Sequence, residues 1–338
     1  MEQIYIMKKT YLTGIKPTGR PHIGNYFGAI KPMIQKINEG QDKYNYFCFL
    51  ADYHALTTVE EAKTLKQNSL MLASIWLACG LNPDKVVFYQ QSDIPQTFEL
   101  ATILSNVTPK GLLNRAHAYK AKVEKNREDG NDDDNDVNMG LFCYPILMAS
   151  DILLMNSNFI PVGLDQKQHV EIARDIAKYF NKRYGNTLVM PNADIDQNVA
   201  TIPGLDGRKM SKSYNNTIEI FCPEAELRKK IFSIKTDSTL PDQPKDTNCT
   251  LFEYIKLFFN KQEQQQIAER FAKGISWAEA KELLFQRANQ VLTPIREKYE
   301  YYMQNPDIVK SILKNGGEKA IKIAQETILR VRNAIGVF

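Results

Sequence analysis

The segment YLTGIKPTGRPHIGN at residues 11–25 joins a short β-rich run to a Gly/Pro-rich turn. An apolar-periodic stretch at residues 25–37 follows and predicts a helix. A helix N-terminus with a glycine beside it is a ready site for an anion, because its backbone N–H groups are free to donate. The segment therefore predicts a strand–turn–helix unit with an anion site at the turn.

The same alternation of strand and helix patterns continues along the first half of the chain. Continuous apolar runs at residues 46–50 and 86–89 have strand length, and a helical pattern covers residues 60–78 between them. Pro95 opens a further helix, where its missing N–H does no harm. Apolar strands separated by long helices indicate a parallel sheet covered on both faces. We predict a doubly wound, Rossmann-type α/β domain whose ligands bind at the carboxyl ends of the strands.

The last third of the chain has a different pattern. From residue 224 onward the sequence is rich in Lys, Glu, Gln and Ala, with no convincing strand and three long helical segments at 262–271, 277–302 and 307–335. The change falls near Cys222-Pro223. We therefore predict an α/β domain at residues 1–221 and an all-α domain at residues 222–338.

Composition excludes several protein classes. Of 338 residues, 43% are hydrophobic and 24% are charged, as in a globular protein with a sizeable core. No apolar stretch approaches the length of a membrane span, and the N-terminus lacks the pattern of a secretory signal. The five cysteines form no CxxC pair, so neither a disulfide framework nor a zinc site is indicated. A reducing cytoplasm is the expected location.

Charge is informative mainly through its position. The net charge is +4, and residues 251–338 hold 14 Lys and Arg against 10 Asp and Glu, so the excess lies in the C-terminal quarter. This excess favours contact with a polyanion. A solvated helical surface with no partner is equally compatible with it.

Residues 128–136 carry six acidic side chains and no basic one. Such a segment cannot bury itself, and we expect a mobile surface loop. A divalent-ion site is the alternative, although the spacing fits no EF-hand loop.

A second segment with chemical potential is KMSKS at residues 209–213, inside a loop punctuated by glycine and proline. Its two lysines can close over a triphosphate and stabilise charge on a departing pyrophosphate. In the first segment, His22 and Asn25 can donate hydrogen bonds to phosphate oxygens. Neither a Walker A loop nor a GxGxxG fingerprint is present, which weakens kinase and dehydrogenase interpretations.

Together, HIGN at residues 22–25 and KMSKS at residues 209–213 resemble the HIGH and KMSKS signatures of class I aminoacyl-tRNA synthetases. The resemblance covers essentially the whole chain. It implies a Rossmann-type catalytic domain with an appended helical domain that recognises the anticodon, and a last helix that can pack back on the catalytic domain. It also implies a homodimer with tRNA spanning both subunits.

The resemblance implies a role for each matching residue. His22 and Asn25 would contact the ATP phosphates and the transition state, and Lys209 and Lys212 would engage the β- and γ-phosphates. The residues that it places at ATP are Lys16, Thr18, Gly24, Asn25, Gly163, Asp165, Met210, Ser211 and Ser213. Mg²⁺ is expected with ATP, held mainly by the phosphates, so no metal-ligating side chains are assigned.

Two further segments, YPILMASDILL at 144–154 and PVGLDQKQH at 161–169, are similar to the tryptophan-specific branch, as is the asparagine that ends HIGN. The resemblance implies that Asp151 accepts the indole N–H. Because indole nitrogen is only a donor, a buried carboxylate left without it is costly, and phenylalanine would be rejected. Met148, Ile160 and Val162 would line the ring, Tyr144 and Gln166 would hold the α-amino group, and His54 would lie beside the pocket. The expected substrates are L-tryptophan, ATP and tRNA(Trp).

Several alternatives remain open from the sequence. The sister tyrosyl-tRNA synthetases share the fold and KMSKS, and a catalytically silent RNA-binding paralogue or a small-molecule nucleotidyltransferase would keep the fold alone. Asp151 could form a helix-internal salt bridge, and His117 a subunit contact or a solvated face. Met148 and Val162 could be ordinary core residues, and we expect His169 to be structural. Lys16 stands where the commonest bacterial tryptophan pattern has glutamine, and it could add a phosphate contact.

Overall fold

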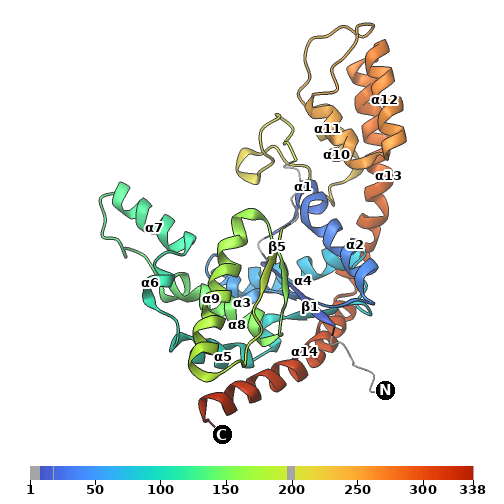
Figure 1. Ribbon diagram of the computed structural model, residues 1–338. Helices are drawn as coiled ribbons and strands as arrows, with labels where there is room; N and C mark the ends of the chain where they lie inside the picture. Colours follow the sequence, from blue (N-terminus) through green and yellow to red (C-terminus); the bar gives the residue numbers. More distant parts are fainter. Residues whose placement is uncertain (1–7, 18, 196–201, 338) are drawn as a thin grey trace.

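The computed structural model describes residues 8–17, 19–195 and 202–337 (Figure 1). Thr18, which the sequence places at ATP, lies outside the described residues. Within the described ranges, no helix is both long enough and apolar enough to cross a bilayer.

The central sheet has five parallel strands in the order β3-β2-β1-β4-β5. The strands are β1 (Lys9–Ile15), β2 (Tyr44–Leu50), β3 (Val87–Gln90), β4 (Phe159–Pro161) and β5 (Asn192–Asp194). The predicted parallel α/β fold is confirmed. The strand order reverses between β1 and β4, which opens a crevice at their carboxyl ends.

Alternate residues of the central strands separate two hydrophobic cores. Tyr11 and Cys48 belong to one core, while Leu12 and Phe47 belong to the other. Successive side chains of a strand point to opposite faces, so both faces of an all-apolar strand must be covered. This explains why residues 46–50 are buried without interruption.

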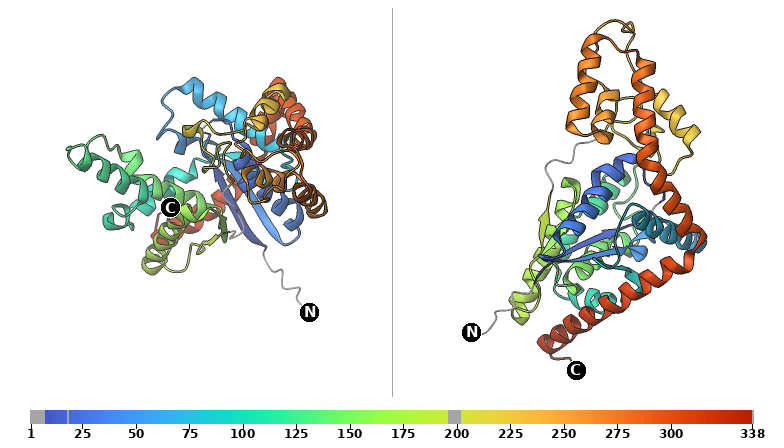
Figure 2. Two further views of the ribbon diagram at one scale, coloured as in Figure 1. Left: turned by 90° about the horizontal axis from the view of Figure 1, so that it is seen from above. Right: turned by 90° about the vertical axis from the view of Figure 1, so that its right-hand side faces the viewer.

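Helices cover both faces of the sheet (Figures 1 and 2). The helical elements of the α/β part are α1 (Ile23–Asn25), the π-helical turn η1 (Tyr26–Ile30), α2 (Lys31–Gly40), α3 (Asp52–Ala55), α4 (Ala62–Ala78), the 3₁₀ turn η2 (Gln91–Asp93), α5 (Gln96–Ser105), α6 (Lys110–Leu113), α7 (His117–Glu128), α8 (Met139–Leu154), the 3₁₀ turn η3 (Leu164–Gln166) and α9 (Lys167–Tyr184). The first helical segment begins at Ile23 rather than at residue 25, because the His22 side chain caps it.

The C-terminal part of the chain is helical, as predicted. Its helices are α10 (Glu224–Phe232), α11 (Thr250–Phe258), α12 (Lys261–Lys273), α13 (Trp277–Gln304) and α14 (Pro306–Ile335), and the 3₁₀ turn η4 (Lys212–Tyr214) precedes them in the loop that carries KMSKS. The expectation of helix throughout is wrong between α10 and α11, where residues 233–249 form no helix. Pro241 and Pro244 fall in this stretch, and each removes a backbone donor and disfavours a helix interior.

The longest helices connect the helical region to the sheet. Figure 2 shows α13 running down from the helical region and α14 crossing along the edge of the sheet. At the crossing, a Cβ added to Gly316 would overlap the backbone carbonyl of Phe88 in β3. Only glycine lets the two backbones come so close. The last helix is thereby packed against the edge strand of the α/β domain.

Candidate active site

Two strand ends and one helix bring the functional side chains together. The chain leaves β2 into α3, which carries His54, and leaves β3 into η2, which begins at Gln91. From the other side, α8 presents Asp151 and leads into β4. Parallel strands align their carboxyl ends, so residues far apart in sequence meet at this edge.

Asp151 is buried, with 4% of its surface exposed. His54 Nε2 lies 3.0 Å from Oδ2, and Gln91 Nε2 donates to Oδ1 at 3.0 Å and to Oδ2 at 2.9 Å. Burial raises the pKa of Asp151, and the hydrogen bonds from His54 and Gln91 oppose that rise. Its partners come from α3 and η2, so the alternative of a helix-internal salt bridge is wrong.

A chain of hydrogen bonds joins α8, α9 and η3 next to Asp151. Tyr144 Oη lies 2.7 Å from His169 Nε2, and His169 Nδ1 lies 2.7 Å from Gln166 Oε1. Burial is the main reason that the pKa of His169 is lowered. His169 is therefore more than a helix-face residue, because it connects the two side chains that the sequence assigned to the α-amino group.

The apolar residues assigned to the ring lie at the same edge. Ile160 is buried in the core that α8 and α9 share, and Met148 and Val162 are partly buried against it. Their packing agrees with a core role as well as with an apolar pocket wall.

His22 and Asn25 form a reciprocal cap at the start of α1. Asn25 N–H donates to His22 Nδ1 at 3.3 Å, and His22 N–H donates to Asn25 Oδ1 at 3.1 Å. An imidazole nitrogen that accepts a hydrogen bond carries no proton, so neutral His22 bears its proton on Nε2. Burial, followed by the charge of Lys212, lowers the pKa of His22 and keeps it neutral. The cap thus leaves Nε2–H of His22 and Nδ2 of Asn25 as donors.

The KMSKS segment lies directly over this cap. A Cβ at Gly24 would come within 3.1 Å of Met210 Sδ, and one at Gly19 within 3.5 Å of Lys212 Nζ. Met210 is buried, whereas Lys209 and Lys212 are exposed. The two signatures, almost two hundred residues apart, therefore make one surface that carries several cations.

Asn216 holds the KMSKS segment in shape. It is 3% exposed, accepts a hydrogen bond from Ser211 N–H at 2.8 Å, and donates to Asp206 Oδ1 at 2.8 Å and to the Lys209 carbonyl at 3.1 Å. Donation from Asn216, together with Arg208, lowers the pKa of Asp206 to about 2. Sequence analysis missed Asn216, since a single asparagine in a polar loop gives no signal of its own burial.

The remaining residues assigned to ATP lie around the same edge. Lys16 Nζ donates to Thr57 Oγ1 at 2.7 Å, and burial lowers the Lys16 pKa. Ser211 and Ser213 place their hydroxyl oxygens 2.8 Å apart. A Cβ at Gly163 would lie 2.6 Å from Asp165 Oδ1, so a larger residue there would displace the Asp165 carboxylate.

Gln91 is the second residue that sequence analysis missed. The apolar run at residues 86–89 was a predicted strand, and polar residues just beyond the carboxyl end of a parallel strand are candidate ligand contacts. That rule points to Gln91, although it does not predict that the Gln91 side chain bonds Asp151.

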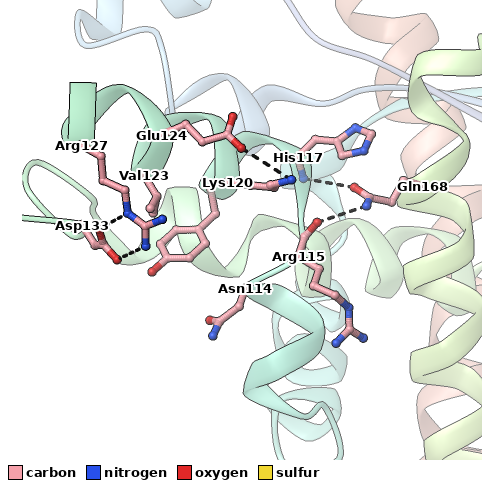
Figure 3. Close-up of a pocket in the computed structure, with 10 residues that line it drawn as sticks. Asn114, Arg115, His117, Lys120, Val123, Glu124, Arg127, Asp133 and Gln168 are labelled. Atoms are coloured by element: carbon pink, nitrogen blue, oxygen red, sulfur yellow. Dashed lines mark hydrogen bonds and ion pairs between the residues drawn. The ribbon is translucent and has the colours of Figure 1, made fainter. Parts of the chain in front are cut away.

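A cavity of about 530 Å³ lies at the base of the projecting helix α7 (Figure 3). Figure 3 shows Gln168 of α9 reaching across to the start of α7, where its side chain bonds His117 N–H at 3.1 Å and the Arg115 carbonyl at 3.1 Å. Arg115, His117 and Lys120 are among its lining residues. Gln168 precedes His169 in α9, so the cavity is next to the Asp151 site but separate from it.

The acidic segment forms an exposed loop after α7, as predicted for its surface position. Its side chains bond to residues of that helix: Arg127 to Asp133 at 2.7 Å, Tyr119 to Asp134 at 2.7 Å, and Lys122 to Asp136 at 3.1 Å. The charge of the loop is thus partly balanced locally.

Comparison with known proteins identifies the family. The sequence model described as tRNA synthetases class I (W and Y) matches residues 7–293. A tryptophan–tRNA ligase of Xanthomonas campestris pv. campestris is 49% identical over 334 residues, which cover 98% of this chain and 77% of the relative. The chain belongs to the tryptophanyl-tRNA synthetases. The match favours the tryptophan branch over its tyrosine-specific sister.

Solved tryptophanyl-tRNA synthetases share the fold. The Campylobacter jejuni synthetase, crystallised with ADP and tryptophan, is 46% identical with a TM-score of 0.88, over 97% of this chain and 100% of the other. The Mycoplasma pneumoniae synthetase is 28% identical with a TM-score of 0.78, over 98% and 99% of the two chains. The arrangement of the sheet and the helical region is therefore that of the synthetase family.

Proposed function

We propose that this synthetase activates L-tryptophan with ATP and transfers it to tRNA(Trp). The tryptophan carboxylate attacks the α-phosphorus of ATP in line, which forms tryptophanyl-adenylate and releases pyrophosphate. A terminal ribose hydroxyl of tRNA then attacks the adenylate carbonyl, and AMP leaves. The observation that carries the proposal is the contact between the two signatures, with Met210 against Gly24 and Lys212 beside Gly19.

In this proposal the capped helix start and the KMSKS lysines bind the triphosphate. Nε2–H of His22 and the Asn25 amide donate to phosphate oxygens, while Lys209 and Lys212 neutralise charge that grows on the leaving pyrophosphate. Interactions that strengthen in the transition state lower the barrier, whereas those equal in both states do not. The exposure of both lysines leaves them free to reach a bound nucleotide.

Backbone and small polar groups complete the proposed ATP site. Gly24 and Gly163 stand where a side chain would collide with neighbours, so they permit the nucleotide to approach the backbone. Lys16 would exchange its bond with Thr57 for a phosphate oxygen. Further contacts are assigned to Asp165, Met210, Ser211, Ser213 and Thr18.

Mg²⁺ would enter with ATP. The polar side chains within the two signatures, at residues 22–25 and 209–213, are imidazole, amide, ammonium and hydroxyl groups, whereas Mg²⁺ prefers carboxylate, phosphate and water oxygens. This donor set fits a metal held by the phosphates of ATP, where the ion would neutralise phosphate charge.

The tryptophan side of the site uses Asp151 to accept the indole N–H. Met148, Ile160 and Val162 would line the ring, with the methionine sulfur suited to aromatic contact. Tyr144 and Gln166 would hold the α-amino group through positions already fixed by His169. His54, which is bonded to Asp151, would stabilise the carboxylate form.

We further propose a catalytic domain at residues 1–221 and a helical domain at residues 222–338 that reads the anticodon. The Lys and Arg excess at residues 251–338 supports contact with RNA. A homodimer would let one tRNA span both subunits, and light scattering on the purified protein tests this. All five cysteines are free thiols, as suits a reducing cytoplasm.

The test is ATP–pyrophosphate exchange with each of the twenty amino acids, without tRNA. Exchange driven by tryptophan alone is the expected result. Exchange driven by tyrosine would move the specificity to the sister family, and no exchange with any amino acid would favour a silent paralogue. Transfer is then measured with tRNA(Trp) transcript, and its anticodon variants test the role of the helical domain.

A further inference from the structure

Gln91 is a buried glutamine, 1% exposed, at the carboxyl end of β3. Its Oε1 accepts hydrogen bonds from the backbone N–H groups of Tyr53 at 3.1 Å and His54 at 3.4 Å. Because only an oxygen can accept these bonds, the amide nitrogen must face the opposite way. There it meets both oxygens of Asp151, at 3.0 and 2.9 Å.

The two short elements around Gln91 are locked to each other. Asp52 at the start of α3 accepts hydrogen bonds from Ser92 N–H at 3.1 Å, from the Ser92 hydroxyl, and from Gln90 Nε2 at 3.4 Å. Asp52 is itself buried. Bonds therefore run in both directions between α3 and η2, so the Gln91 amide is held in place before any ligand binds.

The bonds to Asp151 determine what the carboxylate can still accept. A carboxylate has about four acceptor positions, two on each oxygen. Gln91 occupies one on each oxygen, and His54 occupies a second on Oδ2. Among the described residues, the hydrogen bonds leave one acceptor position, and it is on Oδ1.

We propose that Gln91 is a positioning residue for tryptophan selection, which turns Asp151 so that the remaining acceptor position of Oδ1 meets the indole N–H. The inference rests on the proposed role of Asp151. The Gln91 amide carries no titratable proton, so its donation holds the carboxylate at every working pH. Gln91 touches Asp151 and the backbone of α3, and it acts on the substrate only through them.

Gln91 has two functions: its oxygen anchors α3, and its amide nitrogen donates to Asp151. Two substitutions separate them. Gln91→Met keeps the length and apolar stem but removes both functions. Gln91→Glu keeps an acceptor for the Tyr53 and His54 N–H groups but places a second carboxyl group against Asp151. Like charges this close cannot both ionise, so the pair must share a proton. Gln35→Met is the matched control, because the exposed Gln35 side chain bonds only Glu39 within α2 among the described residues.

The measurement is steady-state ATP–pyrophosphate exchange with tryptophan and with phenylalanine. Gln91→Met is expected to raise KM for tryptophan about tenfold to a hundredfold, as for a lost hydrogen bond to a charged group. KM for ATP should stay within about twofold, since neither Gln91 nor Asp151 is among the residues assigned to ATP. The preference for tryptophan over phenylalanine should fall by a similar factor, and Gln35→Met should change neither quantity.

The second measurement is the pH dependence of KM for tryptophan, made on Gln91→Glu and on the wild-type protein. The titratable groups that face Asp151 are His54 and Asp52 of α3 and Tyr89 of β3, all present in both proteins. In Gln91→Glu, KM for tryptophan relative to wild type should fall as pH is lowered from about 8.5 to 6.5, because the introduced carboxyl gains a proton and becomes a donor. This pH measurement tests the proposal even if Gln91→Met does not fold.

Asp151→Ala tests the role of Asp151 separately from that of Gln91, and it is expected to lose tryptophan selectivity. If it does, and Gln91→Met keeps wild-type KM and selectivity, the positioning role of Gln91 is wrong while the role of Asp151 stands. If Asp151→Ala keeps full selectivity, both roles are wrong. If Gln91→Met raised KM for tryptophan and KM for ATP by the same factor, the fold would be damaged in general, and the inference would also be overturned.

Discussion

The backbone N–H of Ile23 donates a hydrogen bond to the carbonyl oxygen of Ile218, with 2.8 Å between the two atoms. Beside it, His22 and Glu219 form an isolated antiparallel bridge. These bonds attach the end of the KMSKS loop to the start of the first helical segment, while the loop's lysines stay exposed. A fixed base with free cations at the tip suits a loop that tightens on a nucleotide.

Replacing Lys212 by alanine should lower the rate of tryptophan activation far more than it weakens tryptophan binding. The lysine lies beside the His22 cap and away from Asp151, so it acts on developing phosphate charge. We expect a loss of about 10²–10³ in kcat, comparable with the loss of one preorganised donor. Single-turnover formation of the adenylate measures it. Lys178→Ala on the exposed face of α9 is the control, and an unchanged rate in Lys212→Ala would remove the assigned role.

Asn216→Ala should loosen the KMSKS loop without touching a substrate contact. It removes an acceptor for Ser211 N–H and two donors inside the loop. A buried group left unpaired costs about 1–3 kcal/mol, so the loop should populate its working shape less often. KM for ATP should rise and kcat should fall, with KM for tryptophan unchanged. The neighbouring Asn215 has a left-handed backbone (φ 49°) that glycine adopts readily, so Asn215→Gly should behave as wild type.

The pKa of His22 should lie below the ordinary value of 6.5, first because of burial and second because of Lys212. Between the lower pKa of the folded state and pH 6.5, the unfolded chain binds a proton at His22 that the folded chain does not. Stability attributable to His22 is therefore complete above 6.5 and decreases as pH falls below it. The chain has four histidines, so NMR titration with His22→Gln as assignment control is practical.

In Lys212→Ala the pKa of His22 should rise, because the positive charge of Lys212 is gone. It should stay below the ordinary value of 6.5, because His22 remains buried. A His22 pKa at or above 6.5 in the wild-type protein would contradict the neutral donor that we assign to it.

Gly316→Ala should destabilise the protein through one backbone contact. The new methyl group would overlap the Phe88 carbonyl, and neither backbone can move without disturbing α14 or β3. Overpacking of this kind costs about 1–3 kcal/mol, despite the usual gain from replacing a helical glycine. Calorimetry measures the change in Tm. Gly111→Ala in α6 meets no atom within 4 Å and should keep or raise Tm; equal Tm values for the two variants would refute the contact.

The sequence by itself determined the fold class and the reaction chemistry. Uninterrupted apolar runs such as residues 46–50 require a sheet buried on both faces, and the segments around His22 and Lys212 carry the side chains that we propose bind phosphate. Those properties are local, because they depend on side-chain type and spacing over a few residues. The same locality explains why helix ends such as His22 were placed only approximately.

Only the tertiary structure decided which distant groups meet. Asp151 has its partners at positions 54 and 91, Asn216 is buried inside its own loop, and Gly316 crosses β3. No local pattern encodes these contacts, since they arise when the packing of helices, strands and loops brings separate residues together. The donors that hold a buried carboxylate are chosen by that packing, because an unpaired charge cannot be buried at low cost.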